Sequence, residues 1–405
     1  MSHPSEDIKG ARSSILKGKR IVLGITGSIA AVECVKLIRE LIRHSAEVIP
    51  VMSPEATRII HPNAIHFAAG IPPITQLTGD VEHVMYCGDR KDKADMLLIA
   101  PATANTISKI AVGIDDTPVT TFATTALGSG IPVMISPAMH GSMIKHSIIR
   151  ENIEKLRSIG VDFIDPREEE NKAKIANTDQ IVTSVIRRLH KNDLKDLKVL
   201  IISGSTVEHI DDMRVITNKG TGMTGYFLAY ESYIRGGEVT LMVGSHNKIP
   251  EFYWKLEEFS TTDNLSNNLA TLEEDFDIII VCAAISDFAP AKRKGKISSK
   301  KKEVSLELKP TPKVLELLRK THKGSFIVGY KAESGVTKKQ LIDKAYKRMK
   351  QLKIDAIVAN DLKNVKELSN TVVFIDKKKG AKDYAGKKSE LATGIMDSIL
   401  KARRG

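Results

Sequence analysis

The sequence predicts an α/β protein of two domains, each with a parallel sheet that helices cover on both faces. Three observations lead to this fold class. Short apolar runs alternate with amphipathic stretches along the chain, which is the pattern of strand–helix–strand units. The length of 405 residues exceeds one ordinary domain and suits two. A buried strand followed by a turn of small residues and an expected helix start occurs twice, at 19–31 and at 197–206.

The first half alternates between expected strands and expected helices. The strands are short apolar runs of the kind that a parallel sheet buries on both faces, at 21–26, 47–52, 96–100, 132–136 and 161–164. Apolar residues recur at helical spacing at 29–43, 103–112, 147–159 and 179–189. We place the domain boundary in the polar, charged segment 190–196, so the expected domains are 1–190 and 191–405.

The second half continues the alternation. Strands are expected at 199–203, 238–243, 277–282, 326–330, 356–359 and 372–375, and helices at 223–235, 314–320, 337–352 and 391–401. A lysine-rich stretch lies between 287 and 312, with a short hairpin expected at 302–309. A connection of that length between a strand and a helix often serves as a lid over a site.

Composition limits the classes of partner. The net charge is +12, but aromatic residues are only 5% of the chain, whereas surfaces that bind nucleic acid interleave aromatic and basic side chains. We therefore expect no nucleic acid and instead a polyanionic small substrate such as a nucleoside triphosphate.

Cysteine spacing and hydropathy limit the compartment. The 3 cysteines have no C-x-x-C spacing, which excludes a disulfide framework and a zinc finger. No window approaches the ~20 apolar residues of a membrane span, and segment 1–19 lacks an apolar signal region. We expect a cytoplasmic protein without a membrane partner.

Small and hydroxyl-bearing residues follow several expected strands of the first half, at the edge where open α/β sheets bind ligands. Backbone N–H groups and helix starts at such an edge suit a phosphate. The alternative is that the hydroxyls only cap helices and form turns. The candidate ligand-binding residues are Gly27, Ser28, Ile29, Ser53, Pro101, Ala102, Thr103, Asn105, Ala138, Met139 and His140.

Taken together, the turn at 24–31, the Ala-Pro-Ala-Thr-Ala-Asn-Thr run at 100–106 and the Pro-Ala-Met run at 137–139 resemble the signatures of flavin-dependent cysteine decarboxylases. The resemblance implies FMN bound at a subunit interface, a trimer-based assembly, and loss of CO2 from a cysteinyl group bound near Ala138, Met139 and His140. A histidine precedes the second run in this family, and His83 stands there. The resemblance implies that His83 is the base that assists oxidation of the thiol, which suits a side chain that titrates near neutrality.

Two departures from the decarboxylase pattern affect the expected chemistry. His140 stands where the family usually has an asparagine that contacts the substrate carboxylate, and imidazole also donates a hydrogen bond. The flap, expected at 167–177, lacks the cysteine that donates a proton in bacterial relatives. Lys172, Lys174 or Cys87 are the alternatives for that proton donor, with a purely structural role for the Cys87 thiol as the competing interpretation.

The second half resembles phosphopantothenate–cysteine ligase. The runs that carry this resemblance follow in family order at 204–208, 212–218, 221–225, 283–288, 296–297, 329–333 and 358–361. A ligase behind a decarboxylase is the chain order of the bifunctional coenzyme A biosynthesis family. The resemblance implies that 4′-phosphopantothenate is joined to cysteine through an acyl-nucleotide, with release of pyrophosphate.

Residue roles in the ligase half follow from the matched motifs. Arg214 and Asn218 are expected to hold the substrate and the acyl-nucleotide carbonyl. Lys296 is expected to meet triphosphate oxygens, with Mg²⁺ sharing that charge through ligands that the sequence leaves unassigned. Tyr330 is expected to offer a stacking face to the base. The full set of expected nucleotide contacts is Gly204, Ser205, Thr206, Ala283, Asp287, Lys296, Pro312, Lys313, Tyr330 and Lys347.

We therefore expect a bifunctional enzyme that makes 4′-phosphopantetheine, with a flavodoxin-like first domain and a Rossmann-like second domain. CTP is the expected nucleotide and ATP the open alternative, and dimer contacts are expected in the ligase domain. Three other functions stay open: a flavin-dependent decarboxylase of cysteinyl peptides, a prenyl-transferring flavoprotein, and a regulatory FMN-binding protein without decarboxylase activity. The complete second half argues against the first two, and His83 together with that half favours catalysis over the third.

Overall fold

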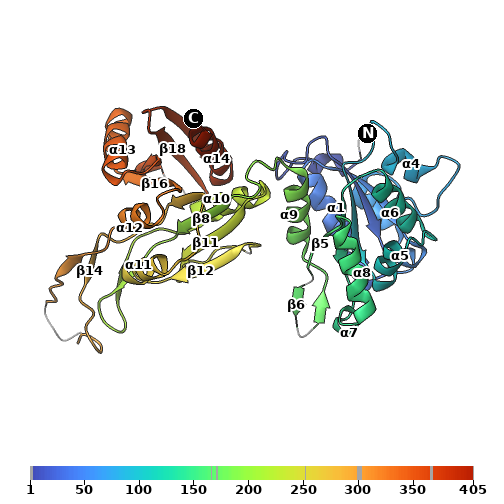
Figure 1. The fold of residues 1–405 in the computed structure, drawn as a ribbon, viewed down its shortest axis with the longest axis horizontal. Helices are drawn as coiled ribbons and strands as arrows, with labels where there is room; N and C mark the ends of the chain where they lie inside the picture. Colours follow the sequence, from blue (N-terminus) through green and yellow to red (C-terminus); the bar gives the residue numbers. More distant parts are fainter. Residues whose placement is uncertain are drawn as a thin grey trace. The chain divides into compact units, whose positions relative to one another are not determined.

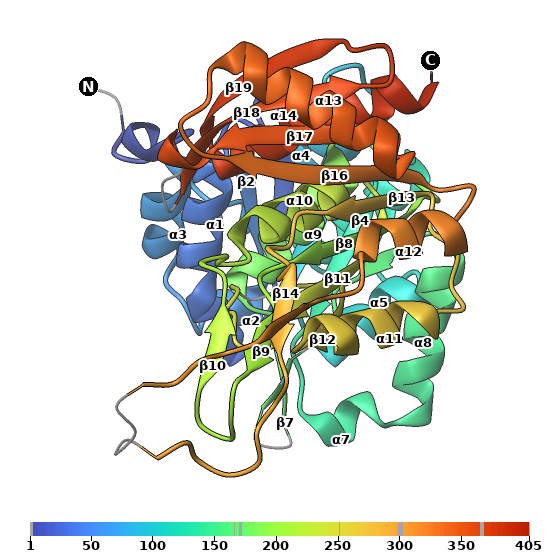
Figure 2. The same ribbon diagram turned by 90° about the vertical axis from the view of Figure 1, so that its left-hand side faces the viewer.

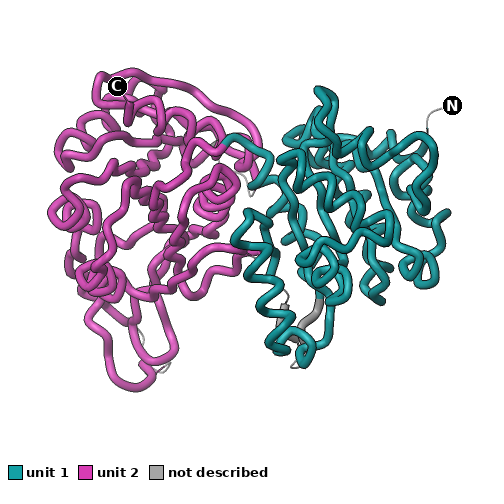
Figure 3. The backbone as a smooth tube through the Cα atoms, turned by 45° about the vertical axis from the view of Figure 1, so that its right-hand side comes forward, with its two compact units in different colours: residues 1–191 teal, residues 192–405 magenta. Residues whose placement is uncertain are grey.

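Two units, Met1–Lys191 and Asn192–Gly405, make up the chain (Figure 3). The computed structural model describes residues 3–165, 167–169, 172–250, 252–298, 303–364 and 368–404, with the backbone alone at 167–169, 172–174 and 364. Within this described part, every helix is too short or too polar to cross a bilayer.

The strands of the first unit pair in the order β2-β1-β3-β4-β5, all of them parallel. They are β1 (Arg20–Ile25), β2 (Glu47–Met52), β3 (Met96–Ala102), β4 (Val133–Pro137) and β5 (Asp162–Phe163). This is the flavodoxin-like order, in which the chain changes direction between β1 and β3. The fully apolar stretches of β1 and β3 are buried along their whole length because helices cover both faces.

Helices lie on both faces of this sheet, with α1 and α9 on one side and α5, α6 and α8 on the other (Figure 1). The helices of the unit are η1 (Glu6–Ile8), η2 (Ile29–Glu33), α1 (Cys34–Arg43), α2 (Pro54–Thr57), α3 (Pro62–Ala69), α4 (Glu82–Cys87), α5 (Ala104–Val112), α6 (Pro118–Gly128), α7 (Gly141–Ile144), α8 (Ser147–Ser158) and α9 (Thr178–Leu189). Between α8 and α9 the expected flap forms an antiparallel hairpin of β6 (Arg167–Glu169) and β7 (Lys172–Lys174).

The second unit has one large sheet in the order β12-β11-β8-β13-β16-β17-β18-β19. Its strands are β8 (Lys198–Ser203), β11 (Glu238–Gly244), β12 (Lys255–Phe259), β13 (Ile278–Val281), β16 (Phe326–Glu333), β17 (Ala356–Asp361), β18 (Ser369–Asp376) and β19 (Ala381–Lys387). The first six strands in chain order are parallel and follow the Rossmann order, while β18 and β19 add an antiparallel edge.

Separate hydrophobic cores lie on the two faces of this sheet. Helices α10 (Met223–Ile234) and α14 (Lys388–Arg404) cover one face, and α11 (Thr262–Ala270), α12 (Val314–Thr321) and α13 (Lys338–Leu352) cover the other. A 3₁₀ turn, η3 (Leu362–Asn364), follows β17. Two short hairpins extend from the carboxyl edge and lie side by side (Figure 2): β9 (Val207–His209) with β10 (Val215–Thr217), and β14 (Phe288–Pro290) with β15 (Leu308–Pro310).

The structure confirms the fold class and every expected strand to within a few residues. It also corrects two expectations. Strand β8 leads into the β9–β10 hairpin rather than into a helix, so only the first small-residue turn begins a helix directly. The hairpin expected at 302–309 is wrong, because 308–310 pairs with 288–290 instead, while residues 299–302 lie outside the described part.

A buried guanidinium fixes the beginning of the second unit. Arg235 at the end of α10 is 1% exposed, and its Nε and Nη2 donate to Asp193 at 2.8 and 2.6 Å. The same guanidinium pairs with Glu231 and with Asp397 of α14, and the N–H of Leu194 bonds to the Arg235 carbonyl. The segment immediately after the boundary is therefore part of the packed second unit.

Candidate active sites

The residues expected to bind the flavin cap helices at the carboxyl edge of the first sheet. Ser28 Oγ accepts a hydrogen bond from a backbone N–H at the start of η2. Ser53 caps α2 and Thr103 caps α5 in the same way, and His140 Nδ1 accepts from the first turn of α7. The capping interpretation is therefore confirmed for these side chains. The helix starts that they cap also make this edge favourable for an anionic phosphate.

Thr26, which is absent from the expected set, joins two of these segments. Its side chain is fully buried, and its Oγ1 donates to the Pro101 carbonyl at 2.8 Å and accepts from the Thr103 N–H at 3.0 Å. The peptide bond before Pro101 is cis. The hydroxyl thus ties the turn after β1 to the loop after β3, across the point where the strand order reverses.

Small residues keep this edge open to a ligand. A Cβ added at Gly27 would overlap the Cβ of Glu55, so the turn passes close to the start of α2. The N–H of Ala138 bonds to the Ala102 carbonyl at 2.9 Å, which joins the two Ala-containing motifs. Ile29 is 78% exposed beside them. Exposed apolar surface next to backbone N–H groups fits a planar, phosphate-bearing group such as a flavin nucleotide.

Two further members of the expected set lie next to the same edge. Asn105 is exposed on the first turn of α5, and Met139 is buried in the core beneath the start of α7. Asn105 lies shortly after Ala102 and Met139 shortly after Pro137, and Ala102 and Pro137 are paired between β3 and β4.

His83 lies on α4, and its ring contacts α6 rather than these helix starts. Its ring meets Phe122 of α6 edge-on, with the ring centroids 6.5 Å apart. Its Nδ1 is buried and has no hydrogen-bond partner among the described residues. Val81, which precedes the helix, has the left-handed φ of 50° that a β-branched residue rarely adopts. An unpaired ring nitrogen fits a base whose partner comes from a bound molecule or another subunit.

The alternatives for the missing proton donor fare differently. Cys87 is fully buried in the core beneath α4, and burial raises the pKa of its thiol to about 12. A thiol in that setting is a packing group rather than an acid–base catalyst. The side chains of Lys172 and Lys174 lie outside the described residues, although β7 lies against α7, which His140 caps.

The second small-residue turn is closed rather than open. Ser205 and Thr206 are fully buried, and the Ser205 N–H donates to Asn247 Oδ1 at 3.0 Å. Asn247 Nδ2 donates to the Gly220 carbonyl at 2.7 Å, so one amide holds the turn to the segment before α10. Gly204 has a φ of +83°, which is why a glycine stands there. The expected backbone cradle at 204–206 therefore has its Ser205 N–H occupied.

A free helix start lies nearby and was not expected as the phosphate contact. Helix α10 begins after Gly222, which has a φ of +80° and provides no side-chain cap. The Gly222 carbonyl is held by Ser203 Oγ at the end of β8. A Cβ added at Gly225, in the first turn of this 12-residue helix, would meet Ser203 and Cys282, so the helix begins beside the ends of β8 and β13. The sequence signal is the pair of glycines at 220 and 222.

Asn218 and the Ala283–Ala284 segment meet at this switch point. Asn218 is exposed, and its Nδ2 donates to the Ala284 carbonyl at 3.0 Å. The Ala284 N–H donates to the Gly204 carbonyl at 2.8 Å. Two expected site motifs far apart in the sequence are therefore in contact.

Asp287 and Lys313, both expected to contact the nucleotide, form an ion pair. Lys313 Nζ lies 2.5 Å from Asp287 Oδ1, and both side chains are partly or largely exposed. The N–H of Thr311, one residue before Pro312, donates to the Asp287 carbonyl at 3.0 Å. An ion pair at this position leaves the Asp287 carboxylate partly neutralised.

Arg214 and Lys296 lie on neighbouring loops. Arg214 Nη1 donates to the carbonyl of Ile297 at 3.1 Å, and Lys296, which precedes it, is exposed. The two cations expected to serve one reaction therefore lie on loops that touch, although 82 residues separate them in the numbering.

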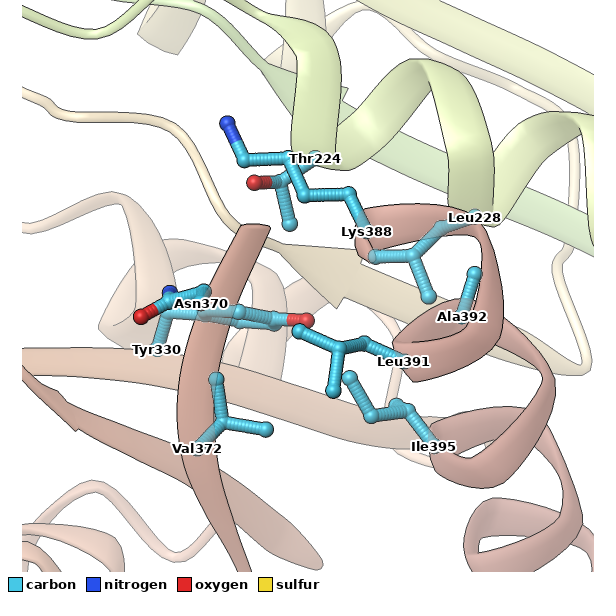
Figure 4. A pocket seen from close by; sticks show the side chains of 9 residues that line it. All are labelled: Thr224, Leu228, Tyr330, Asn370, Val372, Lys388, Leu391, Ala392 and Ile395. Atoms are coloured by element: carbon cyan, nitrogen blue, oxygen red, sulfur yellow. The ribbon is translucent and has the colours of Figure 1, made fainter. Parts of the chain in front are cut away.

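Tyr330 has surroundings that differ from the expected open stacking face. Its ring packs on the core beneath α10 and α14, and its buried hydroxyl has no partner among the described residues. Figure 4 shows it beside a cavity of about 10 Å³ lined by Thr224, Leu228, Asn370, Val372, Lys388, Leu391, Ala392 and Ile395. This volume suits about one water molecule. Burial raises the pKa of the phenol well above its ordinary value.

On α13, Lys344 lies nearer the carboxyl edge than the expected Lys347. Lys344 Nζ pairs with Glu333 at the end of β16, at 2.9 Å. Lys347 is exposed and lies about 4.5 Å further along the helix axis, away from the edge where α13 begins. Among the described residues, no group of three or more His, Cys, Asp or Glu is arranged to hold a metal ion.

Both halves match known families. The model described as Flavoprotein matches residues 10–190, and that of the DNA/pantothenate metabolism flavoprotein C-terminal domain matches residues 194–402. The coenzyme A biosynthesis bifunctional protein of Thermococcus kodakarensis is 46% identical over 412 residues, covering 99% of this chain and 100% of the relative. That of Methanocaldococcus jannaschii is 39% identical and covers 98% of each chain.

Two solved structures are each similar to about half of the chain. The DNA/pantothenate metabolism flavoprotein from Streptococcus pneumoniae is 27% identical with a TM-score of 0.47, covering 51% of this chain and 99% of its own. The FMN-dependent cysteine decarboxylase SpaF is 28% identical with a TM-score of 0.37, covering 43% and 98%. The near-full-length identity and the two domain matches show that the chain belongs to the family of coenzyme A biosynthesis bifunctional proteins.

Proposed function

We propose that the chain converts 4′-phosphopantothenate, cysteine and a nucleoside triphosphate into 4′-phosphopantetheine in two steps. Residues 191–405 form the ligase and residues 1–190 the decarboxylase, so the ligase product is the decarboxylase substrate. The observation that carries the proposal is that both halves match the family along almost the whole chain, at 46% identity.

In the decarboxylase, the proposed cofactor is FMN, with its phosphate at the helix starts that Ser28, Ser53 and Thr103 cap. FMN, when bound, supplies the electron acceptor for the thiol-bearing carbon, which allows the charge left by departing CO2 to be delocalised. His83 would take the thiol proton with its unpaired ring nitrogen. His140 would orient the substrate carboxylate with Nε2, because its Nδ1 already accepts a backbone N–H.

In the ligase, the substrate carboxylate attacks the α-phosphate of the nucleotide, and the cysteine amine then displaces the nucleotide. Arg214 and Lys296 would hold the anionic groups of the two substrates, and Asn218 would donate to the acyl-nucleotide carbonyl. The N–H groups at the start of α10 are our proposed phosphate contact in place of the closed 204–206 turn. CTP is the proposed nucleotide, and Asp287 and Lys313 its proposed neighbours.

Mg²⁺ is proposed to enter with the nucleotide. The residues fit this form of binding better than a preformed protein site, because Asp287 is already paired with Lys313. Phosphate oxygens and water are the usual Mg²⁺ ligands at such sites. For assembly we propose a homo-oligomer, with trimer contacts through the flavin domain and dimer contacts through the ligase domain.

The test is incubation of the purified protein with 4′-phosphopantothenate, cysteine and either CTP or ATP, followed by mass analysis. The expected products are pyrophosphate and 4′-phosphopantetheine, with yellow flavin absorbance in the purified protein. The amide accumulating without loss of CO2 would point to the regulatory FMN-binding alternative, and absence of the amide would sink the ligase proposal.

A further inference from the structure

The two loops that carry Arg214 and Lys296 are joined by one buried carboxylate. Asp211, in the turn between β9 and β10, is fully buried. Its Oδ1 accepts hydrogen bonds from the N–H groups of Met213 and Arg214, at 2.8 and 2.7 Å. These two bonds are local and shape the turn.

The second oxygen of Asp211 reaches the other loop. Oδ2 accepts from Arg214 Nη1 at 2.8 Å and from the backbone N–H of Ile297 at 3.0 Å. Arg214 Nη1 also donates to the Ile297 carbonyl at 3.1 Å. The Ile297 residue is therefore held at its N–H by the carboxylate and at its C=O by the guanidinium. Lys296 is the residue directly before this clamped one.

A second carboxylate links the same loops at the surface. Asp212, 53% exposed, accepts from the Gly295 N–H at 2.8 Å and pairs with Lys292 at 3.2 Å. Asp212 thus makes two solvent-exposed contacts to the loop that the buried Asp211 also holds. Two backbone bonds run beside them, from the Arg293 N–H to the Ile210 carbonyl and from the Asp212 N–H to the Gly295 carbonyl. Exposed pairs contribute little because water screens them, so Asp211 should dominate.

We propose that Asp211 is a positioning residue of the ligase that fixes the separation of Arg214 and Lys296. The inference rests on the proposed ligase function. Asp211 has no exposed surface with which to touch a substrate, and all its acceptor capacity toward the second loop is used. If Arg214 binds the attacking carboxylate or its phosphate and Lys296 the triphosphate, this link sets the distance over which the carboxylate meets the α-phosphate.

The carboxylate stays ionised over any working pH. Hydrogen bonds from the Ile297 N–H first, then from Met213 and Arg214, hold the pKa of Asp211 at about 2. A variant that loses the charge therefore changes the link itself and does not merely shift a titration near neutrality.

The substitution Asp211→Asn isolates the link between the loops. Asparagine makes the same local turn through its oxygen. Its NH2 group then faces the Ile297 N–H and the Arg214 guanidinium, which places donors against donors. Asp212→Asn is the matched control. It removes the charge of the neighbouring carboxylate, whose contact with the other loop is exposed to solvent.

The experiment uses the full-length protein and measures pyrophosphate release, CTP affinity and decarboxylation of added 4′-phosphopantothenoylcysteine. Asp211→Asn should lower kcat for acyl-nucleotide formation by about 100-fold. CTP affinity and decarboxylation should change less than about threefold, because each cation and the other unit are intact. Asp212→Asn should match the native protein, and Asp211→Glu should recover part of the lost kcat.

Hydrogen exchange gives a readout that needs no activity. Exchange of the Ile297 N–H should accelerate in Asp211→Asn and remain near the native rate in Asp212→Asn. Native kcat in Asp211→Asn, equal losses of kcat and CTP affinity, or unchanged exchange would overturn the proposal. A native protein that forms no amide would instead refute the ligase function, and exchange would still decide whether the link exists.

Discussion

The two small-residue turns look alike in the sequence and differ in the fold. The first, after β1, enters a helix that Ser28 caps and leaves its edge open beside an exposed Ile29. The second, after β8, enters a hairpin, and its Ser205 N–H is taken by Asn247. We propose that the first turn holds a phosphate directly and that the start of α10 takes this role in the second unit, where the turn is closed.

What the two turns share is a threonine. Thr26 Oγ1 accepts the N–H of Thr103 in the loop after β3, and Thr206 Oγ1 accepts the N–H of Ser286 in the loop after β13, each at 3.0 Å. In both units the hydroxyl joins the first strand to its neighbour across the switch point of the sheet. The common element is therefore a buried tie that fixes the ligand edge, and the glycines serve different local needs.

The largest effect should come from separating the two chemistries. His83→Asn should lower decarboxylation by roughly 100- to 10,000-fold, because a general base is lost, and leave pyrophosphate release intact.

Asn218→Asp should lower ligation by about 100-fold or more, since it replaces a donor with a negative charge. Product analysis by mass spectrometry measures both. Loss of both reactions in either variant would contradict the division of labour between the units.

Glycine-to-alanine changes should break the two turns for different reasons. Gly27→Ala meets Glu55 in α2, and such overpacking costs about 1–3 kcal/mol. Gly204→Ala combines a left-handed φ of +83°, which costs about 1–2 kcal/mol for an L-residue, with a contact to Asn247.

Rescue separates these two causes. Glu55→Gly should restore stability to the Gly27→Ala protein because it removes the overlapping atom, whereas Asn247→Ala should not restore the Gly204→Ala protein because the backbone conformation remains. Flavin fluorescence reports unfolding of the first unit. Trp254, the 1 tryptophan of the chain, reports the second. Equal rescue of the Gly27→Ala and Gly204→Ala proteins would show that alanine disturbs both turns for the same reason.

Removing the two threonine hydroxyls should destabilise the two units by amounts similar to those of the glycine changes. Thr26→Val and Thr206→Val keep the side-chain shape but leave buried N–H groups unpaired, at about 1–3 kcal/mol each. Each variant should lower the unfolding temperature of its own unit only. Unfolding followed by the same two fluorophores measures this, and a shift of the wrong transition would show that the ties are not local.

Acid should destabilise the first unit before the second. Burial lowers the pKa of His44 below 6.5, against the opposing effect of Glu40. Its contribution to stability is complete above pH 6.5 and is lost as the pH falls below that value, because the unfolded state then binds the extra proton.

In the second unit, the titratable group that we compare with His44 is Asp211, and its pKa is much lower. The pKa of Asp211 is lowered from 3.8 to about 2, so its contribution persists above pH 3.8 and fades between there and about pH 2. Urea unfolding at stepwise pH should show the first unit weakening below pH 6.5, with a flatter slope in His44→Gln. The opposite order would count against both assignments.

Buried parallel strands were the most predictable part of the fold. Continuous apolar runs such as 199–203 can lie only between two layers of helix, so their place follows from local sequence. Helix α6 was missed because its threonines have weak helix propensity, and packing of Phe122 and its neighbours in the core overrides that preference. Strand β19 was also missed, because it is a polar edge strand without an apolar face.

The site was predictable where a motif is contiguous and unpredictable where a contact is distant. The capping hydroxyls follow from motifs that end strands, whereas the ion pair between Asp287 and Lys313 joins distant segments and was not predicted. Thr26, Asn247 and Asp211 were missed, because each acts through a partner in a loop that only the folded sheet brings near. Their residue types alone are common in any turn.

The buried guanidinium of Arg235 has a consequence for how such a protein is divided between genes. Its partner Asp193 stands 2 residues beyond Lys191, the last residue of the first unit, yet belongs to the packed interior of the second. A ligase encoded separately must therefore begin ahead of Asp193, because a later start leaves the buried Arg235 guanidinium without one of its carboxylate partners. A chain that starts later would keep Glu231 and Asp397 beside Arg235 but lose both bonds to Asp193, so the packed second unit begins at or before Asp193.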